Sequence, residues 1–102
     1  MTEMTPGRSP AWLTAAVDQR IAMMRAELPD PRSFEGKEVV MTYLTEPEEN
    51  ASKQDIERWE NSCDNCGRYC PNTLIPGEAR RELHGKPVLI GFGMCPRCKE
   101  LP

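Results

Sequence analysis

Cys63-Asp64-Asn65-Cys66-Gly67 and Cys95-Pro96-Arg97-Cys98 are the two stretches that decide the fold of this chain. Each is a Cys-x-x-Cys hook whose two thiolates can bind one metal ion, and residues 67–94 between the hooks are numerous enough to bring them together. Four thiolates around one ion form the closed, tetrahedral shell of a structural zinc site. The spacing therefore predicts that Cys63, Cys66, Cys95 and Cys98 bind one Zn²⁺.

The composition indicates one small domain that needs such a site. Only 38% of the 102 residues are hydrophobic and ten are prolines, so a metal ion would supply much of the fold that a larger apolar core supplies elsewhere. We find no run of 18 apolar residues and no basic segment followed by an apolar one at the N-terminus. We therefore expect no membrane span, no signal peptide and a cytoplasmic location, where reduced thiols bind metal more readily than they form disulfides.

Charge is unevenly distributed along the chain. The formal net charge is −3, and residues 26–62 contribute −6 of it, from ten acidic and four basic side chains. Residues 63–102 carry six basic and four acidic side chains, and a tetrathiolate zinc site would bring that region close to neutrality. A surface that binds duplex nucleic acid usually needs a concentrated basic face, and the sequence shows none.

The N-terminal region predicts a tail and then a helix. Residues 1–8 lack periodicity, whereas Ser9 and Pro10 suit an N-cap and a first helical position. The helix is predicted from Pro10 to Leu28, with a one-sided stripe made of Leu13, Val17, Ile21, Met24 and Leu28. We favour packing of this stripe on the rest of the domain. The alternative is docking into a partner, for which Trp12 and Met24 are candidate contacts.

The middle of the chain predicts a strand and a short helix. Val39 to Thr45 is rich in β-branched and aromatic residues, so it could add a strand to the sheet of the cysteine module. Thr45-x-x-Glu48 and Ser52-x-x-Asp55 are both possible capping boxes, and a helix is expected over about 53–61. We expect Trp59 to pack near the metal module, and the alternative role for it is a partner hot spot.

Within the cysteine module, Gly67 fits the sharp turn of a metal-binding knuckle. Strands are predicted over Tyr69–Ile75 and Val88–Met94, with a turn at Pro76-Gly77 and two helical turns over Glu78–His84. Gly91 and Gly93 are interpreted as room for close packing, because the motif lacks the third glycine of a nucleotide-binding loop.

Three further side chains bear on chemistry. Arg80 and Arg81, close to His84, form the densest basic cluster, which is either plain surface charge or a contact for phosphate or an acidic partner. His84 is predicted to end a helix rather than to bind metal. Cys70 is the fifth cysteine, and we expect a spare, partly buried thiol rather than a replacement ligand.

Residues 63–98 resemble the zinc-ribbon superfamily, in which two Cys-x-x-Cys knuckles are joined by a β-hairpin or small sheet. Cys63, Cys66 and Gly67 match the first knuckle, and Cys95, Pro96 and Cys98 match the second, although Lys99 replaces the usual glycine. A treble-clef finger fits less well, because that fold takes its last ligands from a C-terminal helix and only four residues follow Cys98. The spacing from Cys63 to Tyr69 and from Cys95 to Cys98 also resembles rubredoxins, which hold a redox-active iron.

We therefore expect an α+β protein with a loose tail (1–8), a helix-strand-helix region (9–62) and a zinc-ribbon module (63–102). An enzyme is the least supported class, since four cysteines close the metal shell and no nucleophile-base pair is evident. The resemblance points to transcription and RNA-polymerase-associated factors. Our preferred function is a protein-interaction adaptor on RNA polymerase or another large assembly. A nucleic-acid-binding ribbon is the alternative, and an iron-binding electron carrier is the third.

Overall fold

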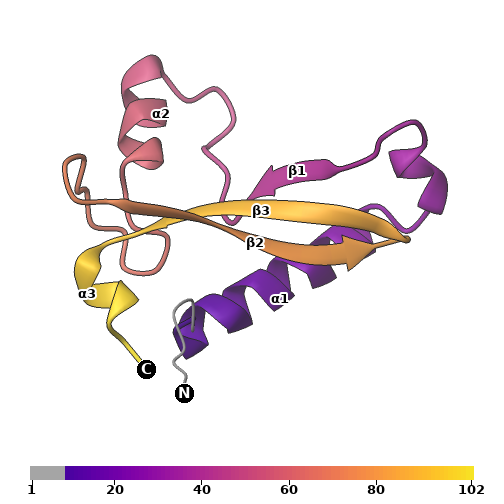
Figure 1. Ribbon diagram of the computed structural model, residues 1–102. Helices are drawn as coiled ribbons and strands as arrows, with labels where there is room; N and C mark the ends of the chain where they lie inside the picture. The colour runs from indigo at the N-terminus through magenta and orange to yellow at the C-terminus, as the bar shows by residue number, and fades with distance from the viewer. Residues whose placement is uncertain (1–8) are drawn as a thin grey trace.

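The computed structural model describes residues 9–102, and the predicted tail (1–8) lies outside the described residues. The chain has a mixed α+β fold, which is the fold class predicted from the sequence (Figure 1). In chain order its elements are α1 (Ala11–Glu27), the 3₁₀ helix η1 (Pro31–Phe34), β1 (Val40–Tyr43), α2 (Lys53–Glu60), β2 (Ile75–Leu83), β3 (Lys86–Met94) and α3 (Pro96–Lys99).

A three-stranded sheet in the order β1-β3-β2 forms the centre of the fold. β2 and β3 make an antiparallel hairpin, and β1 pairs in parallel with the other side of β3, from Val40 opposite Val88 to Tyr43 opposite Gly91. The strand predicted over Val39–Thr45 is thus confirmed over its central residues, Val40–Tyr43, and it joins the sheet of the cysteine module. Two prolines are tolerated here because Pro76 lies on the edge strand β2 and Pro87 precedes the part of β3 that β1 covers.

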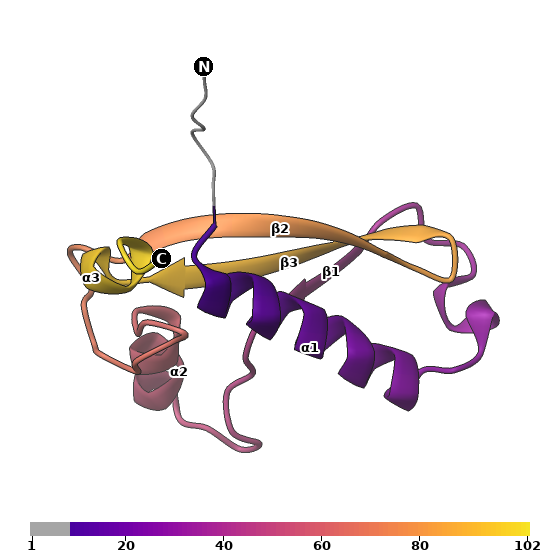
Figure 2. The ribbon, with the colours of Figure 1, turned by 90° about the horizontal axis from the view of Figure 1, so that it is seen from below.

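Helix α1 covers one face of this sheet and runs along it (Figure 2). Four residues of its predicted stripe, Leu13, Val17, Ile21 and Met24, are buried in one cluster with residues of β2 and β3 that include Leu83, Val88 and Ile90. Leu28, the fifth, remains 37% exposed. The stripe therefore packs on the domain, which was the favoured of the two interpretations.

Both ends of α1 are held by distant parts of the chain rather than by the predicted Ser9 cap. Pro10 is the N-cap residue and no side chain caps the helix, but the backbone N–H of Ala11 donates to the carbonyl oxygen of Pro102 at 3.0 Å. At the other end, Nε2 of His84 lies 2.7 Å from the carbonyl oxygen of Leu28. Tertiary contacts thus supply partners for helix-end groups that a local cap would otherwise have satisfied.

The predicted helical turns over Glu78–His84 are wrong, because these residues belong to the extended strand β2 and the turn after it. Pro76-Gly77 lies inside the strand and makes no turn. The hairpin turns instead at His84-Gly85, between the paired residues Leu83 and Lys86, and both turn residues have positive φ (54° and 77°). A two-residue turn of this conformation matches the twist of antiparallel strands.

The predicted strand over Tyr69–Ile75 is also wrong, apart from its last residue. Tyr69 forms only an isolated bridge with Ser62, and the chain then turns at Pro71-Asn72, with the N–H groups of Thr73 and Leu74 donating to the carbonyl oxygen of Cys70. By contrast, β3 confirms the predicted strand over Val88–Met94 and extends it by two residues.

Helix α2 confirms the helix predicted over about 53–61 and its cap. Ser52 accepts a hydrogen bond from the N–H of Asp55, and the Asp55 carboxylate accepts one in return from the N–H of Ser52. The other candidate box begins no helix, because Thr45 uses its hydroxyl in tertiary hydrogen bonds.

Candidate metal centre

The Sγ atoms of Cys63, Cys66, Cys95 and Cys98 all lie within 4.8 Å of one another, so the structure brings together the four predicted ligands. The Cys66 and Cys95 sulfurs are 3.7 Å apart. A tetrahedral zinc site with Zn–S bonds of about 2.3 Å requires sulfurs about 3.8 Å apart, so the spacing suits one tetrahedrally bound ion.

The first hook is shaped by a tight turn around its backbone. The N–H of Cys63 donates to the carbonyl oxygen of Arg68, and the N–H of Gly67 donates back to the carbonyl oxygen of Cys63, each at 2.9 Å. Gly67 has a φ of 78°, a conformation that costs glycine little, which confirms the turn predicted there. The N–H of Asn65 also lies 3.4 Å from the Cys63 sulfur, so the turn presents donors to a ligand atom.

The second hook is built on the first turn of α3. Cys95 is the N-cap residue, Pro96 occupies the first helical position and Cys98 lies within the helix. The N–H of Lys99 donates to the carbonyl oxygen of Cys95 at 3.0 Å. One helical turn is enough to bring both thiols to the same side. The small number of residues after Cys98 is therefore no argument against a treble-clef arrangement.

The electrostatics of the four thiols favour a bound cation. Burial raises the pKa of Cys63, but the backbone N–H groups of Cys66, Cys95 and Asn65 outweigh this effect and lower it to about 6. The backbone N–H of Cys98 likewise lowers the pKa of Cys95. The side-chain amide of Asn65, 3.3 Å from the Cys98 sulfur, lowers the pKa of Cys98, yet burial and the neighbouring thiols together raise it to about 12. Sulfurs this close cannot all be thiolates at neutral pH without a positive ion between them.

Burial distinguishes the four ligands from one another. Cys63, Cys95 and Cys98 are buried among the core residues, whereas Cys66 is exposed. The cluster thus lies at the edge of the core, with one ligand facing solvent. Exposed Arg68 and Arg97 line the same surface hollow as Cys66.

Cys70 and His84 lie outside this cluster. Cys70 is buried, and its sulfur is 3.5 Å from the carbonyl oxygen of Arg68, in agreement with the expectation of a spare thiol. His84 occupies the β2–β3 turn, where its ring also lies 5.8 Å from that of Phe34. The prediction that His84 ends a helix is therefore wrong, because Glu78–Leu83 is strand and His84 lies in the hairpin turn. Its ring nitrogen nevertheless contacts the C-terminal carbonyl of α1 at Leu28.

Arg80 and Arg81, the predicted basic cluster, project to opposite faces because successive residues of a strand alternate. Arg81 pairs with Asp18 of α1, with 3.2 Å between Nε and Oδ1, whereas Arg80 is exposed and stands opposite Leu89. Because these residues form a strand, the two charges lie on opposite faces of the sheet and do not form one patch.

The other candidate contacts differ in their exposure. Met24 is buried in the core, with 6% of its surface exposed. Trp12 is half-buried, and its indole N–H donates to the carbonyl oxygen of Cys98 at 2.9 Å. Trp59 is also half-buried and lines an open cleft between α2 and the sheet.

Sequence reasoning missed the role of Asp64 inside the first hook. Its carboxylate accepts hydrogen bonds from the N–H of Gly93 at 2.8 Å and from the hydroxyl of Thr45 at 3.0 Å, and Thr45 accepts one from the indole of Trp59 at 2.9 Å. The Asp64 N–H also donates to the carbonyl oxygen of Gly93 at 2.9 Å. This series of hydrogen bonds joins α2, the first hook and β3, and confirms that Trp59 lies near the metal module.

Comparison of the chain with protein families, curated proteins and solved structures finds no match. Among the helices within residues 9–102, none is long and apolar enough to cross a membrane. The four-cysteine cluster and the surfaces around it are therefore the features that bear on function.

Proposed function

We propose that the four cysteines hold one structural Zn²⁺ and that the domain so stabilised acts as a protein-interaction adaptor. The observation that carries the first part is the mutual approach of four sulfurs at the spacing of a tetrahedral site. Tetrahedral sulfur sites in proteins hold zinc or iron. Zinc is favoured here by the resemblance of residues 63–98 to zinc ribbons.

A structural role suits the position of the cluster in the fold. The second hook follows directly from the central strand β3, and the first is tied to that strand through Asp64. An ion that joins the hooks would therefore clamp the middle of the sheet to the segment that leads out of α2. Four protein ligands also leave no coordination position for a substrate, so we do not propose catalysis at this metal.

The adaptor proposal is supported by the charge of the surface. Residues 46–60 carry six acidic and two basic side chains, and the separation of Arg80 from Arg81 removes the densest basic cluster. Zinc ribbons include factors that dock on RNA polymerase, so a large assembly of this kind is the proposed class of partner.

The zinc proposal is tested by metal analysis of matched cysteine variants. We expect about one zinc per chain in the wild type and in Cys70→Ser, and substoichiometric zinc with loss of the C-terminal fold in Cys95→Ser and Cys66→Ser. Full zinc content and an unchanged fold in both ligand variants would overturn the proposal. A red protein whose visible absorption is bleached by dithionite would instead assign iron and electron transfer.

The adaptor proposal is tested by affinity capture from the native host, using the zinc-loaded chain. A specific protein partner that is retained after nuclease treatment is the expected result. Binding of bare DNA or RNA in the micromolar range, with affinity that falls steeply as salt rises, would favour the nucleic-acid alternative. In that case Arg68 and Arg97, exposed beside Cys66, are the first residues to reverse to Glu.

A further inference from the structure

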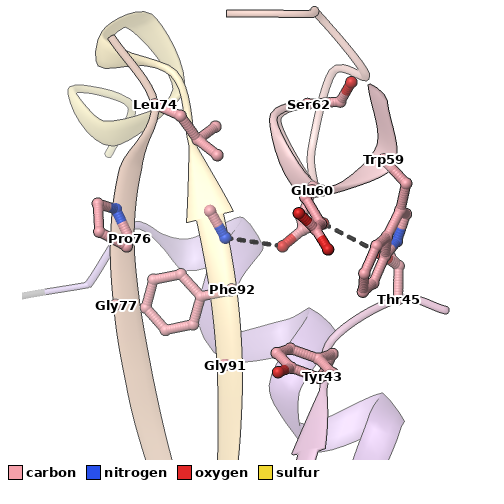
Figure 3. Close-up of a pocket in the computed structure, with 12 residues that line it drawn as sticks. Tyr43, Thr45, Trp59, Glu60, Ser62, Leu74, Pro76, Gly77, Gly91 and Phe92 are labelled. Carbon is pink, nitrogen blue, oxygen red and sulfur yellow. Dashed lines mark hydrogen bonds between the residues drawn. The ribbon is translucent and has the colours of Figure 1, made fainter. Parts of the chain in front are cut away.

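A cleft of about 290 Å³ opens between α2 and the sheet (Figure 3). Its apolar lining comes from three separate parts of the chain: Tyr43 at the end of β1, Trp59 of α2, and Leu74 and Phe92 of the β2–β3 region. Gly77, Gly91 and Gly93 also line it, so backbone forms part of its wall.

The glycines allow the large side chains to lie directly against the strands. A Cβ atom on Gly91 would be 3.1 Å from Cδ1 of Tyr43, and one on Gly93 would be 2.7 Å from Cδ2 of Leu74. A Cβ on Gly77 would come within 2.6 Å of the Phe92 ring. The interpretation of Gly91 and Gly93 as room for close packing is thus confirmed, and the packing they permit shapes the cleft.

Two of the aromatic rings are held at a fixed angle to each other. Tyr43 and Trp59 have ring centroids 5.6 Å apart and planes inclined at 85°. The indole N–H of Trp59 is engaged by Thr45, which is itself bonded to Asp64 of the first hook. The rings are therefore oriented before any ligand arrives, while Tyr43 remains 60% exposed.

The charge around this cleft is negative. Glu60 and Asp64 both belong to its lining, and no Lys or Arg does, within the part of the chain that the structure describes. The Asp64 carboxylate already accepts hydrogen bonds from Gly93 and Thr45, so exposed Glu60 is the acidic residue that a ligand can pair with. Arg58, which directly precedes Trp59 in α2, lies over the ring of Tyr69, 5.1 Å from its centroid. Aromatic faces combined with an acidic rim attract a cation that keeps its own apolar stem in contact with the rings.

We propose that this cleft receives the arginine side chain of a basic segment in the partner protein. The guanidinium is planar and stacks on aromatic faces, and it can also pair with the carboxylate of Glu60. The acidic segment 46–60 then steers the rest of the basic segment toward the cleft. This inference rests on the proposed adaptor function and specifies the chemistry of its partner.

The test uses the zinc-loaded full chain and a defined probe, the peptide acetyl-GSRGRSG-amide. The indole N–H signals of the chain in a ¹⁵N-¹H correlation spectrum are assigned with Trp59→Phe and followed during titration. We expect the Trp59 signal to shift saturably while that of Trp12 does not. The matched peptide with citrulline in place of arginine, which has nearly the same shape but no charge, should bind about tenfold more weakly.

Variants of the chain locate the binding site. Tyr43→Ala and Glu60→Gln should each weaken binding of the arginine peptide by about tenfold. The first removes an aromatic wall of the cleft, and the second removes the Glu60 carboxylate. Glu27→Gln, at the exposed end of α1, changes the net charge equally and should leave the affinity within about twofold of wild type. Equal loss in Glu27→Gln and Glu60→Gln, equal binding of the citrulline peptide, or no shift of Trp59 at millimolar peptide would each overturn the proposal.

The outcome can be separated from that of the adaptor proposal. If the host partner is captured equally well by the wild type, Tyr43→Ala and Glu60→Gln, the adaptor function stands and the assignment of the cleft fails. If no protein partner is captured at all, the adaptor function itself fails.

Discussion

The indole N–H of Trp12 donates to the carbonyl oxygen of Cys98, with 2.9 Å between the two atoms, across 86 positions of sequence. The N–H of the preceding residue, Ala11, donates to the carbonyl oxygen of Pro102. The start of α1 is thus attached to the element that carries Cys95 and Cys98, the second cysteine pair of the candidate metal site. Because the same helix buries its stripe on the sheet, packing of the helix and closure of the metal site support each other.

Substitution of Trp12 by Phe should weaken this attachment. The variant keeps an aromatic side chain but loses the hydrogen bond, which should reduce the free energy of unfolding by about 1 kcal/mol. Urea unfolding of the zinc-loaded protein measures the change. Met23→Ala, which truncates a side chain that is 46% exposed on the same helix, serves as the control and should have a smaller effect. An unchanged midpoint in Trp12→Phe would show that the bond does not stabilise the fold.

Substitution of Gly77 by Ala should disturb the aromatic cleft. The new methyl group would lie within 2.6 Å of the Phe92 ring, so the ring or the strand must move. Overpacking of this kind typically costs about 1–3 kcal/mol. Thermal unfolding gives the cost, and the chemical shifts of the Phe92 ring show whether it has moved. A matched Gly36→Ala change meets no atom within 4 Å but lies at a φ of 83°, so its cost should be backbone strain alone, with no change at Phe92.

Removal of the α2 cap should loosen the wall that carries Trp59. Ser52→Ala eliminates the hydroxyl that accepts from Asp55, a loss that costs about 1 kcal/mol in typical helices. Because α2 contains only eight residues, the effect should appear as local opening rather than global unfolding. Hydrogen exchange should accelerate in residues 53–60 and leave the amides of β3 unchanged. Equal acceleration in β3 would contradict this local assignment.

The parts of the fold that could be predicted are those in which local pattern and tertiary packing agree. The stripe of α1, the Ser52 cap and the apolar run of β3 each carry their own signal, and the four ligands follow from Cys-x-x-Cys spacing alone. In β2 the local sequence pattern and the tertiary packing disagree. Glu78 to Leu83 has the composition of a helix, but pairing with β3 and the His84-Gly85 turn impose a strand, with Leu83 buried to 1% exposure.

The candidate cleft could not be predicted, because its walls come from positions far apart in the sequence. Tyr43, Trp59 and Phe92 meet only after β1 has joined β3 in parallel and α2 has folded back over the first hook. The wrong prediction of helical turns over Glu78–His84 likewise gave a wrong surface. The basic cluster expected at Arg80 and Arg81 does not form, because alternation along the strand separates the two side chains. The four candidate metal ligands could be predicted from the Cys-x-x-Cys spacing. The surfaces could not, because they depend on which strands pair and on which face each side chain lies.

The last prediction concerns Tyr69, whose hydroxyl donates to Oε1 of Glu57 at 2.7 Å. This hydrogen bond to a carboxylate raises the pKa of Tyr69 above its ordinary value, and burial and the Glu57 charge act in the same direction, while Arg58 opposes them. A raised pKa in the folded state means that the interaction stabilises the fold below about pH 10, the value for an unfolded chain. This contribution is lost as the pH rises through the folded pKa.

Glu57→Gln should therefore bring the pKa of Tyr69 down toward its ordinary value, because a neutral amide replaces the carboxylate and Arg58 remains over the ring. The titration can be followed by the tyrosinate absorbance of the zinc-loaded protein in a Tyr43→Phe background, which leaves Tyr69 as the one remaining tyrosine. Glu48→Gln makes the same change of net charge on the same acidic segment and should leave the Tyr69 pKa unmoved. If Glu48→Gln lowers it as much as Glu57→Gln does, the shift comes from the general field of residues 46–60, and the specific hydrogen bond makes no measurable contribution.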